Sequence, residues 1–353
     1  MDKLESILIR PNFELTRALR QLNESGEKIL FVTGDDRTLL GVVTDGDIRR
    51  WILKNNNMNI SVEEVMNKEP IFIYEGFEKE KAQELLVANR IDCIPVVDKD
   101  KKIISAIWWI DLFEKEFREK KQISLPVVIM AGGMGSRLTP FTKILPKPLI
   151  PINDKPIIER IIDNFVEYGC RDFYVSIYYM ANIIKAYFSD FKHDYKLQYI
   201  QEDKPLGTAG SLYLLKDAIK DTFFVTNCDI LIDADYADIL RFHRENKHEI
   251  TIIGSTKSYT IPYGVCETET SGRLKRIKEK PEYGLLVNTG MYLLEADVLN
   301  EIPKDRFHHI TDLINDYLIK GKRVGVYPIL EKSWLDVGEL EQLQAALKKF
   351  GVS

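Results

Sequence analysis

Residues 125–152, LPVVIMAGGMGSRLTPFTKILPKPLIPI, determine the expected fold. The apolar run Leu125–Met130 is typical of a buried strand, and it opens directly into a glycine-rich turn. Because glycine has no Cβ, the backbone N–H groups of such a turn can approach a phosphate closely. Arg137 and Lys147 would bring positive charge to the same anion. The glycines of this turn are Gly132, Gly133 and Gly135.

The chain after this turn alternates between helical and strand-like segments. An apolar stripe at helical spacing runs from Pro156 to Gly169, and the segment Ile183–Phe188 is also amphipathic. Phe173–Tyr178 and Phe223–Asn227 are typical of buried strands, and Glu339–Phe350 is a predicted closing helix. This alternation predicts an α/β, Rossmann-like domain with a mostly parallel sheet covered on both faces. Such sheets bind ligands at the carboxyl ends of their strands, where the glycine turn lies.

The first third of the chain contains an internal repeat with an offset of 64 residues. The apolar segment Lys28–Val32 corresponds to Asp92–Val96, and Asp47 corresponds to Asp111. Each copy is too small for a stable core of its own, so we expect the two to pack together as an α+β pair. The charged run 114–121 is expected to end this pair as a helix end or linker. The predicted boundaries are 1–57 and 58–121 for the repeats, 1–121 for the pair and 122–353 for the second domain.

Composition excludes several classes of protein. The net charge of −5 over 353 residues argues against a nucleic-acid binder, which needs a basic face. No apolar run has the length that a membrane span requires, and the N-terminus lacks the pattern of a secretion signal. None of the four cysteines forms a Cys-x-x-Cys pair, so we expect free thiols and a cytoplasmic location.

Two motifs further along the chain each allow two interpretations. In YIQEDKPLGTAGSL, residues 199–212, Gln201 suits a base edge, while Gly207 and Thr208 suit a backbone that passes close to a flat ligand. The alternative for this run is a glycine-bearing turn that enters a helix. Asp229 ends the buried strand Phe223–Asn227 and is either a turn former or a metal ligand.

A short run around Gly264 and three later motifs carry the remaining candidates. Gly264 lies in a Tyr-Gly-Val run that begins a strand, and Glu279 and Lys280 precede a proline. These two charged residues are either ligand contacts or an exposed charged edge. Asn288 lies in Val-Asn-Thr-Gly, and Asp336 lies in Trp-Leu-Asp-Val-Gly.

Taken in order, these six motifs resemble those of the sugar-phosphate nucleotidyltransferases, over about residues 125–350. The resemblance implies that Asp229 and Asp336 hold Mg²⁺, with Cys228 standing where the family more often has glycine. It implies phosphate contacts for Arg137, Lys147 and Lys280. It further implies nucleotide contacts for Gly132, Gly133, Gly135, Gln201, Gly207 and Thr208, and sugar contacts for Gly264, Glu279 and Asn288.

The reaction that this resemblance implies transfers a nucleoside monophosphate from a nucleoside triphosphate to a hexose 1-phosphate and releases pyrophosphate. The attacking phosphate oxygen is already ionised, so neutralisation and alignment are needed rather than a general base or a covalent intermediate. The motif at residues 199–212 resembles the guanylyltransferase and MurNAc-phosphate uridylyltransferase branches of this family. The order of the two domains, with the repeat pair before the transferase, resembles that of enzymes of bacterial legionaminic acid biosynthesis. Together these resemblances favour GTP with glucosamine 1-phosphate, or a mannose-type sugar. The alternatives are a uridylyl- or cytidylyltransferase, or a nucleotide sensor with an inactive transferase domain.

The N-terminal repeat resembles a pair of cystathionine-β-synthase-type (CBS) domains. That resemblance implies an adenine nucleotide bound by Thr44 and Asp47, and a homo-oligomer formed by stacked pairs. The second copy keeps Asp111 but has Trp108 in place of the hydroxyl residue. The alternative is that Asp47 and Asp111 simply cap the helices that follow them.

Overall fold

The structure is a computed structural model that describes residues 3–55, 57–89, 91–112, 120–189, 193–339 and 342–343. Most of the predicted linker 114–121 and of the closing helix Glu339–Phe350 lies outside the described residues. The chain divides into two compact units, each formed by several segments. The first unit is Met1–Glu119, Thr256–Val287 and Pro328–Lys332, and the second is Lys120–Ser255, Asn288–Tyr327 and Ser333–Ser353.

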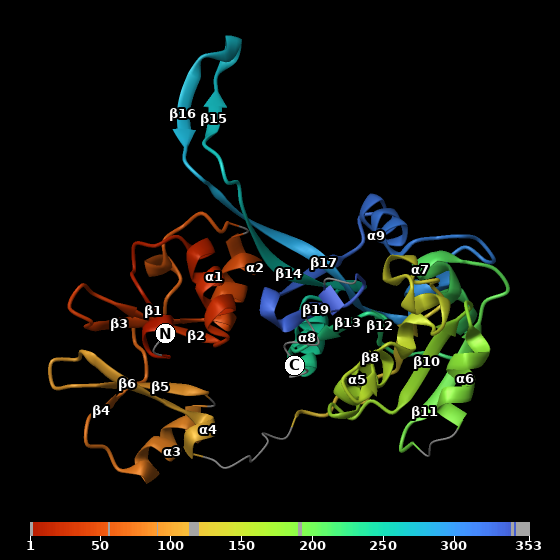
Figure 1. Cartoon of the computed structure of the whole chain (residues 1–353), viewed down its shortest axis with the longest axis horizontal. Helices are drawn as coiled ribbons and strands as arrows, with labels where there is room; N and C mark the ends of the chain where they lie inside the picture. The colour runs from red at the N-terminus through yellow and green to blue at the C-terminus, as the bar shows by residue number, and fades with distance from the viewer. Residues whose placement is uncertain are drawn as a thin grey trace. The chain divides into compact units, whose positions relative to one another are not determined.

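In the described part of the chain, a seven-stranded sheet of order β11-β10-β7-β12-β17-β14-β18 forms the centre of the second unit's fold. Strands β11, β10, β7 and β12 run parallel, and β17 runs antiparallel to β12 (Figure 1). The mostly parallel α/β sheet that the sequence predicts is therefore confirmed. The strands are β7 Val127–Met130, β10 Asp172–Ile177, β11 Lys196–Gln201, β12 Phe223–Asn227, β14 Ile250–Thr260, β17 Glu282–Leu294 and β18 Val324–Ile329.

Helices cover both faces of this sheet. On one face, Val128 and Val225 pack against apolar side chains of α7 and α9, such as Leu313. On the other face, the ring of Phe165 from α5 contacts Phe224 of β12, with ring centroids 5.2 Å apart. The alternation of neighbours such as Phe224 and Val225 between the two faces is the period of a strand that is buried on both sides. The helices are α5 Ile157–Val166, α6 Ala181–Ser189, α7 Gly207–Gly210, α8 Tyr236–Glu245 and α9 Ile310–Ile319.

The first unit contains the two sequence repeats, each with a three-stranded sheet and helices. The predicted offset of 64 residues holds in the strand register, because Ile9 pairs with Val32 and Ile73 pairs with Val96. Both β2–β3 and β5–β6 also shift register at the corresponding place, after Val32 and after Val96. The elements are β1 Leu8–Ile9, α1 Leu15–Ser25, β2 Ile29–Thr33, β3 Leu39–Thr44, α2 Asp45–Asn55, β4 Ile73–Tyr74, α3 Lys79–Asn89, β5 Cys93–Val97, β6 Ile103–Trp108 and α4 Trp109–Leu112.

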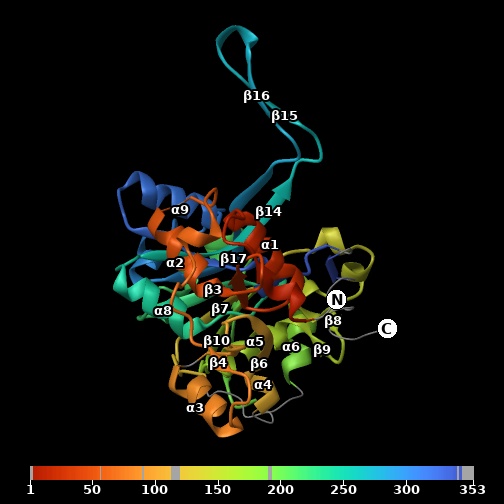
Figure 2. The same cartoon turned by 90° about the vertical axis from the view of Figure 1, so that its left-hand side faces the viewer.

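The first unit also takes in two segments from the later part of the chain. Leu330 is 4% exposed and belongs to the apolar core that contains Leu19 and Val32. Arg20 of α1 donates from Nε to Glu282 Oε1 at 3.0 Å, so the start of β17 is tied to the first repeat. The segment Thr256–Val287 also contains a two-stranded hairpin of β15 Val265–Thr268 and β16 Leu274–Lys278, which Figure 2 shows from a second direction.

The helices give one further result. Among the described residues, none of the helices combines the length and the apolar character that crossing a membrane would require.

A buried histidine makes the stability of the second unit depend on pH. His243 is fully buried, with Nδ1 at 2.8 Å from Thr251 Oγ1 and Nε2 at 2.9 Å from Glu295 Oε1. Burial lowers the pKa of His243 below its ordinary value of 6.5, although the hydrogen bond to the Glu295 carboxylate and its negative charge oppose this effect. The unfolded chain therefore binds more protons than the folded chain as the pH falls below 6.5.

We predict that the free energy of unfolding decreases as the pH falls below 6.5, and that His243→Gln reduces this slope. Glutamine keeps hydrogen-bonding capacity at the site but does not titrate. Urea unfolding at pH values from 5 to 8 measures the slope, and the wild-type and variant curves should run parallel above pH 7. Equal slopes below pH 6.5 would remove His243 as the cause.

Candidate functional site

A cavity of about 360 Å³ lies at the carboxyl ends of the parallel strands β7 and β12. Met130 at the end of β7 and Asn227 at the end of β12 both line it, and they are register partners. The cavity therefore occupies the place where parallel α/β sheets bind ligands. Eight of the predicted site residues line it, namely Gly132, Gly133, Gly135, Arg137, Lys147, Gly207, Thr208 and Asp229.

The two predicted metal carboxylates lie close together. Strand β13 (Ile230–Ile232) pairs antiparallel with β19 (Trp334–Asp336), which places Asp336 opposite Ile230, next to Asp229. A Cβ built on Gly338 would lie 2.9 Å from Asp229 Oδ2 and 2.9 Å from Asp336 Oδ1. Both carboxylate oxygens thus point at one spot beside Gly338, and only glycine leaves that spot open.

Lys147 provides the positive charge at this pair. It lies between Pro146 and Pro148, and its Nζ forms an ion pair with Asp229 Oδ2. Both side chains of this pair are only 12% exposed, so little water screens the interaction. Burial raises the pKa of the Asp336 carboxyl, and the nearby charge of Asp229 adds to the rise. The Gly338 N–H, which donates to Asp336 Oδ1 at 2.7 Å, opposes it.

These carboxylates fit a magnesium ion. Mg²⁺ in such sites is held by one or two carboxylates and by phosphate oxygens, with water at the remaining positions. In the described ranges, no group of three or more His, Cys, Asp or Glu residues gathers as a metal cage. Asp229 and Asp336 therefore form a pair of carboxylates that would leave coordination positions of the metal open for phosphate oxygens.

The glycine turn leads from β7 to the rim of the cavity. Gly135 has a φ of +64°, and a Cβ there would lie 2.8 Å from Thr142 Cγ2, so a side chain would be strained at this position. Arg137 follows on a short 3-10 helix, is exposed, and donates from Nη1 to Glu339 Oε1 at 3.0 Å. Because both partners of this ion pair are exposed to water, the pair is weak, and Arg137 can exchange Glu339 for a phosphate at little cost.

Beside the glycine turn, the structure brings Glu202 rather than its neighbour Gln201 to the cavity, and a Cβ on Gly132 would lie 3.0 Å from Glu202 Oε1. Gln201 is exposed, and its Oε1 accepts a hydrogen bond from Lys185 Nζ at 2.6 Å. Glu202 lines the cavity and is 6% exposed. Its carboxylate accepts from Ser176 Oγ at 2.5 Å and from the backbone N–H of Leu206 at 3.0 Å. Sequence reasoning missed Glu202, although the alternation of side chains along a strand places adjacent residues on opposite faces.

The next turn, around Gly207 and Thr208, is shaped by packing. Gly207 has a φ of +80°, and a Cβ there would lie 2.6 Å from the carbonyl oxygen of His308. Thr208 Oγ1 accepts a hydrogen bond from the N–H of Ile310 at 3.0 Å, at the start of α9. Both residues line the cavity, so this turn joins the cavity wall to α9.

The predicted sugar contacts fall in both units. Gly264 and Glu279 are neighbours in the first unit, where a Cβ on Gly264 would lie 3.0 Å from Glu279 Oε2. Lys280 follows Glu279 in the same unit. Asn288 belongs to the second unit, where its Nδ2 donates to Tyr292 Oη at 2.8 Å. A joint role for these residues with Asp229 stays a prediction.

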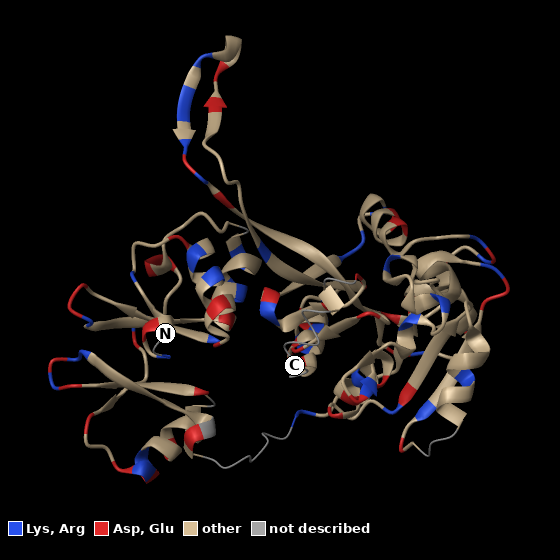
Figure 3. Ribbon diagram, viewed as in Figure 1, with Lys and Arg blue, Asp and Glu red and all other residues tan. Residues whose placement is uncertain are grey.

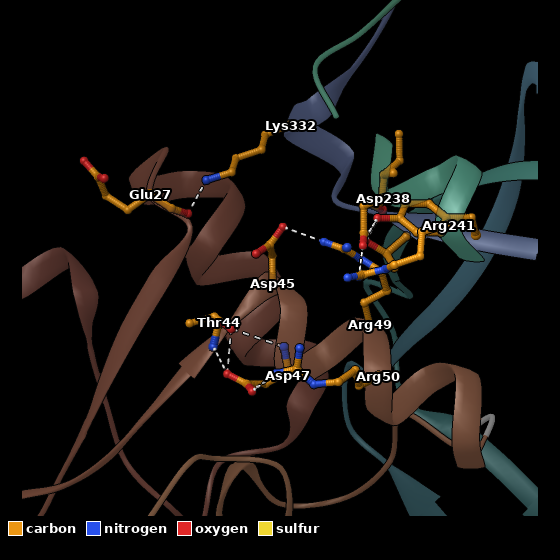
Figure 4. A network of polar contacts seen from close by, with 12 residues as sticks. Glu27, Thr44, Asp45, Asp47, Arg49, Arg50, Asp238, Arg241 and Lys332 are labelled. Carbon is orange, nitrogen blue, oxygen red and sulfur yellow. Dashed lines mark hydrogen bonds and ion pairs between the residues drawn. The ribbon is translucent and has the colours of Figure 1, made fainter. Parts of the chain in front are cut away.

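The Thr44–Asp47 motif forms a reciprocal cap at the start of α2. Thr44 Oγ1 donates to Asp47 Oδ2 at 2.6 Å, and the Asp47 N–H donates to Thr44 Oγ1 at 3.2 Å (Figure 4). Arg50 contacts the other carboxylate oxygen of Asp47. In the second repeat, Asp111 accepts from the Trp108 N–H at 3.3 Å. These contacts agree with the capping interpretation, and a nucleotide at Thr44, Asp47 and Asp111 stays a prediction.

Comparisons with known proteins match both parts of the chain. The family model described as "Nucleotidyl transferase" matches residues 126–351, and the CBS domain model matches residues 2–54 and 62–107. A "Probable mannose-1-phosphate guanylyltransferase 1" of Oryza sativa subsp. japonica is 35% identical over 188 residues. That match covers 50% of this chain and 52% of the relative.

One further relative and one solved structure also match. A "UTP--glucose-1-phosphate uridylyltransferase" of Synechocystis sp. is 30% identical over 246 residues, which cover 64% of this chain and 63% of the relative. The chain thus covers less than two thirds of these relatives' length. The crystal structure of HddC from Yersinia pseudotuberculosis complexed with GMP-PN matches with a TM-score of 0.51 and 25% identity. It covers 64% of this chain and 100% of that chain.

We predict that Gly338→Ala lowers the rate of nucleotidyl transfer by about 10²-fold, because the new Cβ displaces the two carboxylates. Thermal unfolding should show a folded protein, and a pyrophosphate-release assay measures the rate. Gly46→Ala is the matched control, because its Cβ would meet no atom closer than 3.4 Å. Full activity of Gly338→Ala would contradict the convergence of Asp229 and Asp336 on this spot.

Proposed function

Because this chain belongs to the nucleotidyl transferase family, with a CBS domain pair before the transferase domain, we propose that it is a sugar-1-phosphate guanylyltransferase. The proposed reaction transfers GMP from GTP to a hexose 1-phosphate and releases pyrophosphate. The observation that carries the proposal is the meeting of Lys147, Asp229 and Asp336 beside a cavity that Glu202 also lines.

The chemistry of this reaction is mainly electrostatic. The two reactants are polyanions that repel each other, and the attacking oxygen is already ionised because the second pKa of a phosphate monoester is about 6. The site must therefore neutralise charge and align the two phosphates. A magnesium ion held by Asp229 and Asp336 would add positive charge at the phosphate oxygens.

The side chains of the second unit have distinct roles in this proposal. Lys147 holds the attacking phosphate in line, because it is a cation fixed between two prolines beside Asp229. Arg137 and the N–H groups of the glycine turn stabilise the departing pyrophosphate. Lys280 and Glu279 are proposed to contact the sugar phosphate, on the strength of the family resemblance.

Glu202 supports guanine over the other bases. The Watson–Crick edge of guanine presents two adjacent donors, N1–H and N2–H₂, whereas uracil, thymine, cytosine and adenine each pair a donor with acceptors. A carboxylate is an acceptor-only group with about four lone-pair sites. Ser176 and Leu206 occupy one site on each oxygen of Glu202 and leave one free on each. Two adjacent acceptors match two adjacent donors.

Glucosamine 1-phosphate is the favoured acceptor sugar, with a mannose-type sugar 1-phosphate next, because a CBS pair before a transferase domain resembles the arrangement in legionaminic acid biosynthesis enzymes. The uridylyltransferase among the relatives keeps UTP as the second candidate nucleotide. A matrix of GTP, UTP, CTP and dTTP against a panel of sugar 1-phosphates, read by pyrophosphate release, tests the proposal. If no combination releases pyrophosphate, the result would favour a nucleotide sensor with an inactive transferase domain.

We predict that Asp229→Asn lowers kcat by roughly 10²-fold or more, because one of the two carboxylates for the metal is lost. Steady-state kinetics at saturating magnesium measures the effect. The matched control is Asp217→Asn, which removes an exposed carboxylate near Lys220 and should leave kcat unchanged. Wild-type turnover of Asp229→Asn would exclude Asp229 from the mechanism.

We also predict that Glu202→Gln reduces the preference for GTP over UTP by roughly 10- to 100-fold, since glutamine replaces one acceptor with a donor. The ratio of kcat/KM values for the two nucleotides measures the preference. Gln201→Ala is the comparison variant, because Gln201 is exposed and pairs with Lys185. If Gln201→Ala alters the ratio and Glu202→Gln does not, the base contact belongs to Gln201.

A further inference from the structure

A second cavity, of about 900 Å³, lies entirely within the first unit. Its walls are the beginning of α1 with the loop before it, and the chain from Arg276 to Tyr283, where β16 ends and β17 begins. Small-molecule sites have volumes of about 300–1,000 Å³, so this cavity has the size of a ligand site. Thr44 and Asp47 do not line it.

The lining of this cavity is rich in positive charge. Five cationic side chains line it against three carboxylates, and Figure 3 shows blue segments on both α1 and β16. The carboxylates are Glu14, Glu279 and Glu282. The cations are Arg17, Arg20, Arg276, Lys278 and Lys280.

Three of these cations already have carboxylate partners. Arg20 pairs with Glu282, while Arg276 and Lys278 both pair with Glu267, at 2.6 and 3.0 Å. Among the residues that the structure describes, Arg17 and Lys280 form no ion pair. The guanidinium of Arg17 instead lies 3.7 Å from the centre of the Phe13 ring.

Neutral polar groups lie beside these two cations. The side-chain amides of Asn12 and Asn59 line the cavity, as does Tyr283, whose ring is partly exposed. Amides both donate and accept hydrogen bonds, so they suit the hydroxyl groups of a sugar or a ribose. Two cations without ion-pair partners, together with amides and aromatic rings, are suited to recognise a phosphate that is attached to a sugar or a nucleoside.

We propose that this cavity binds a phosphate monoester of a nucleoside or a sugar, with the phosphate held by Arg17 and Lys280. Both cations are exposed, so they can reach the ligand without breaking an existing ion pair. The wall opposite α1 is fixed in place, because Glu282 is bound by Arg20 and Gly284 packs against Met58.

Occupancy of this cavity has a consequence for catalysis, which rests on the proposed function. Lys280 and Glu279 line the cavity and are also the proposed contacts of the sugar 1-phosphate. When a ligand in the cavity binds Lys280, this lysine can no longer contact the sugar 1-phosphate, so the bound ligand raises the KM for the sugar 1-phosphate. The first repeat thereby regulates the transferase through Arg17.

Calorimetry on the full-length protein tests the binding. The probes are AMP, GMP and glucose 6-phosphate, since all three are phosphate monoesters and they differ in the nucleoside or sugar to which the phosphate is attached. We expect at least one probe to bind, and Arg17→Gln to weaken that binding roughly tenfold or more. Arg17→Lys should restore part of the affinity. Arg37→Gln is the matched control, because Arg37 pairs with Glu5 and does not line the cavity.

The outcomes separate this inference from the proposed function. No heat with any probe, or binding that Arg17→Gln leaves unchanged, overturns the site. If a probe binds through Arg17 but leaves the KM for the sugar 1-phosphate unchanged, the regulatory consequence is overturned. A protein that binds the probe through Arg17 yet releases no pyrophosphate supports the site and contradicts the proposed function. Thermal unfolding of Arg17→Gln checks that the variant is folded.

Discussion

The convergence of Asp229 and Asp336 beside Lys147 is the constraint on which the site of the second unit depends. Two carboxylates that face the same spot repel each other, and their partial burial increases the cost. One lysine offsets only part of that negative charge. A divalent cation would offset the negative charge that remains, which suits the magnesium ion of the proposed function.

Backbone pairing holds the two carboxylates in this arrangement. Strands β13 and β19 pair so that Asp336 lies opposite Ile230, and the Val337 N–H donates to the carbonyl of Asp229 at 2.9 Å. Glycine at position 338 then keeps the space between the carboxylates open. Because strand pairing fixes the positions of both carboxylates, the site is preorganised before a substrate binds.

Sequence reasoning identified most of the groups at this site but not all of their orientations. Asp229 and Asp336 were predicted as one pair, and the structure brings them together. Gln201 was predicted to face the base, whereas Glu202 is the residue that lines the cavity. Both residues belong to one motif, and a motif does not show which neighbour faces the ligand. That choice depends on how β11 pairs with β10, through long-range hydrogen bonds.

The sequence by itself determined four features, because each depends on the local spacing and periodicity of residues. These are the two families, the mostly parallel sheet, the glycine turn and the repeat of 64 residues. Only the tertiary structure decided that Thr256–Val287 and Pro328–Lys332 belong to the first unit. An apolar strand has the same local pattern whichever core it joins. The contacts of Leu330 with the core of the first repeat, and of Glu282 with Arg20, join residues more than two hundred positions apart, and no local pattern encodes such a contact.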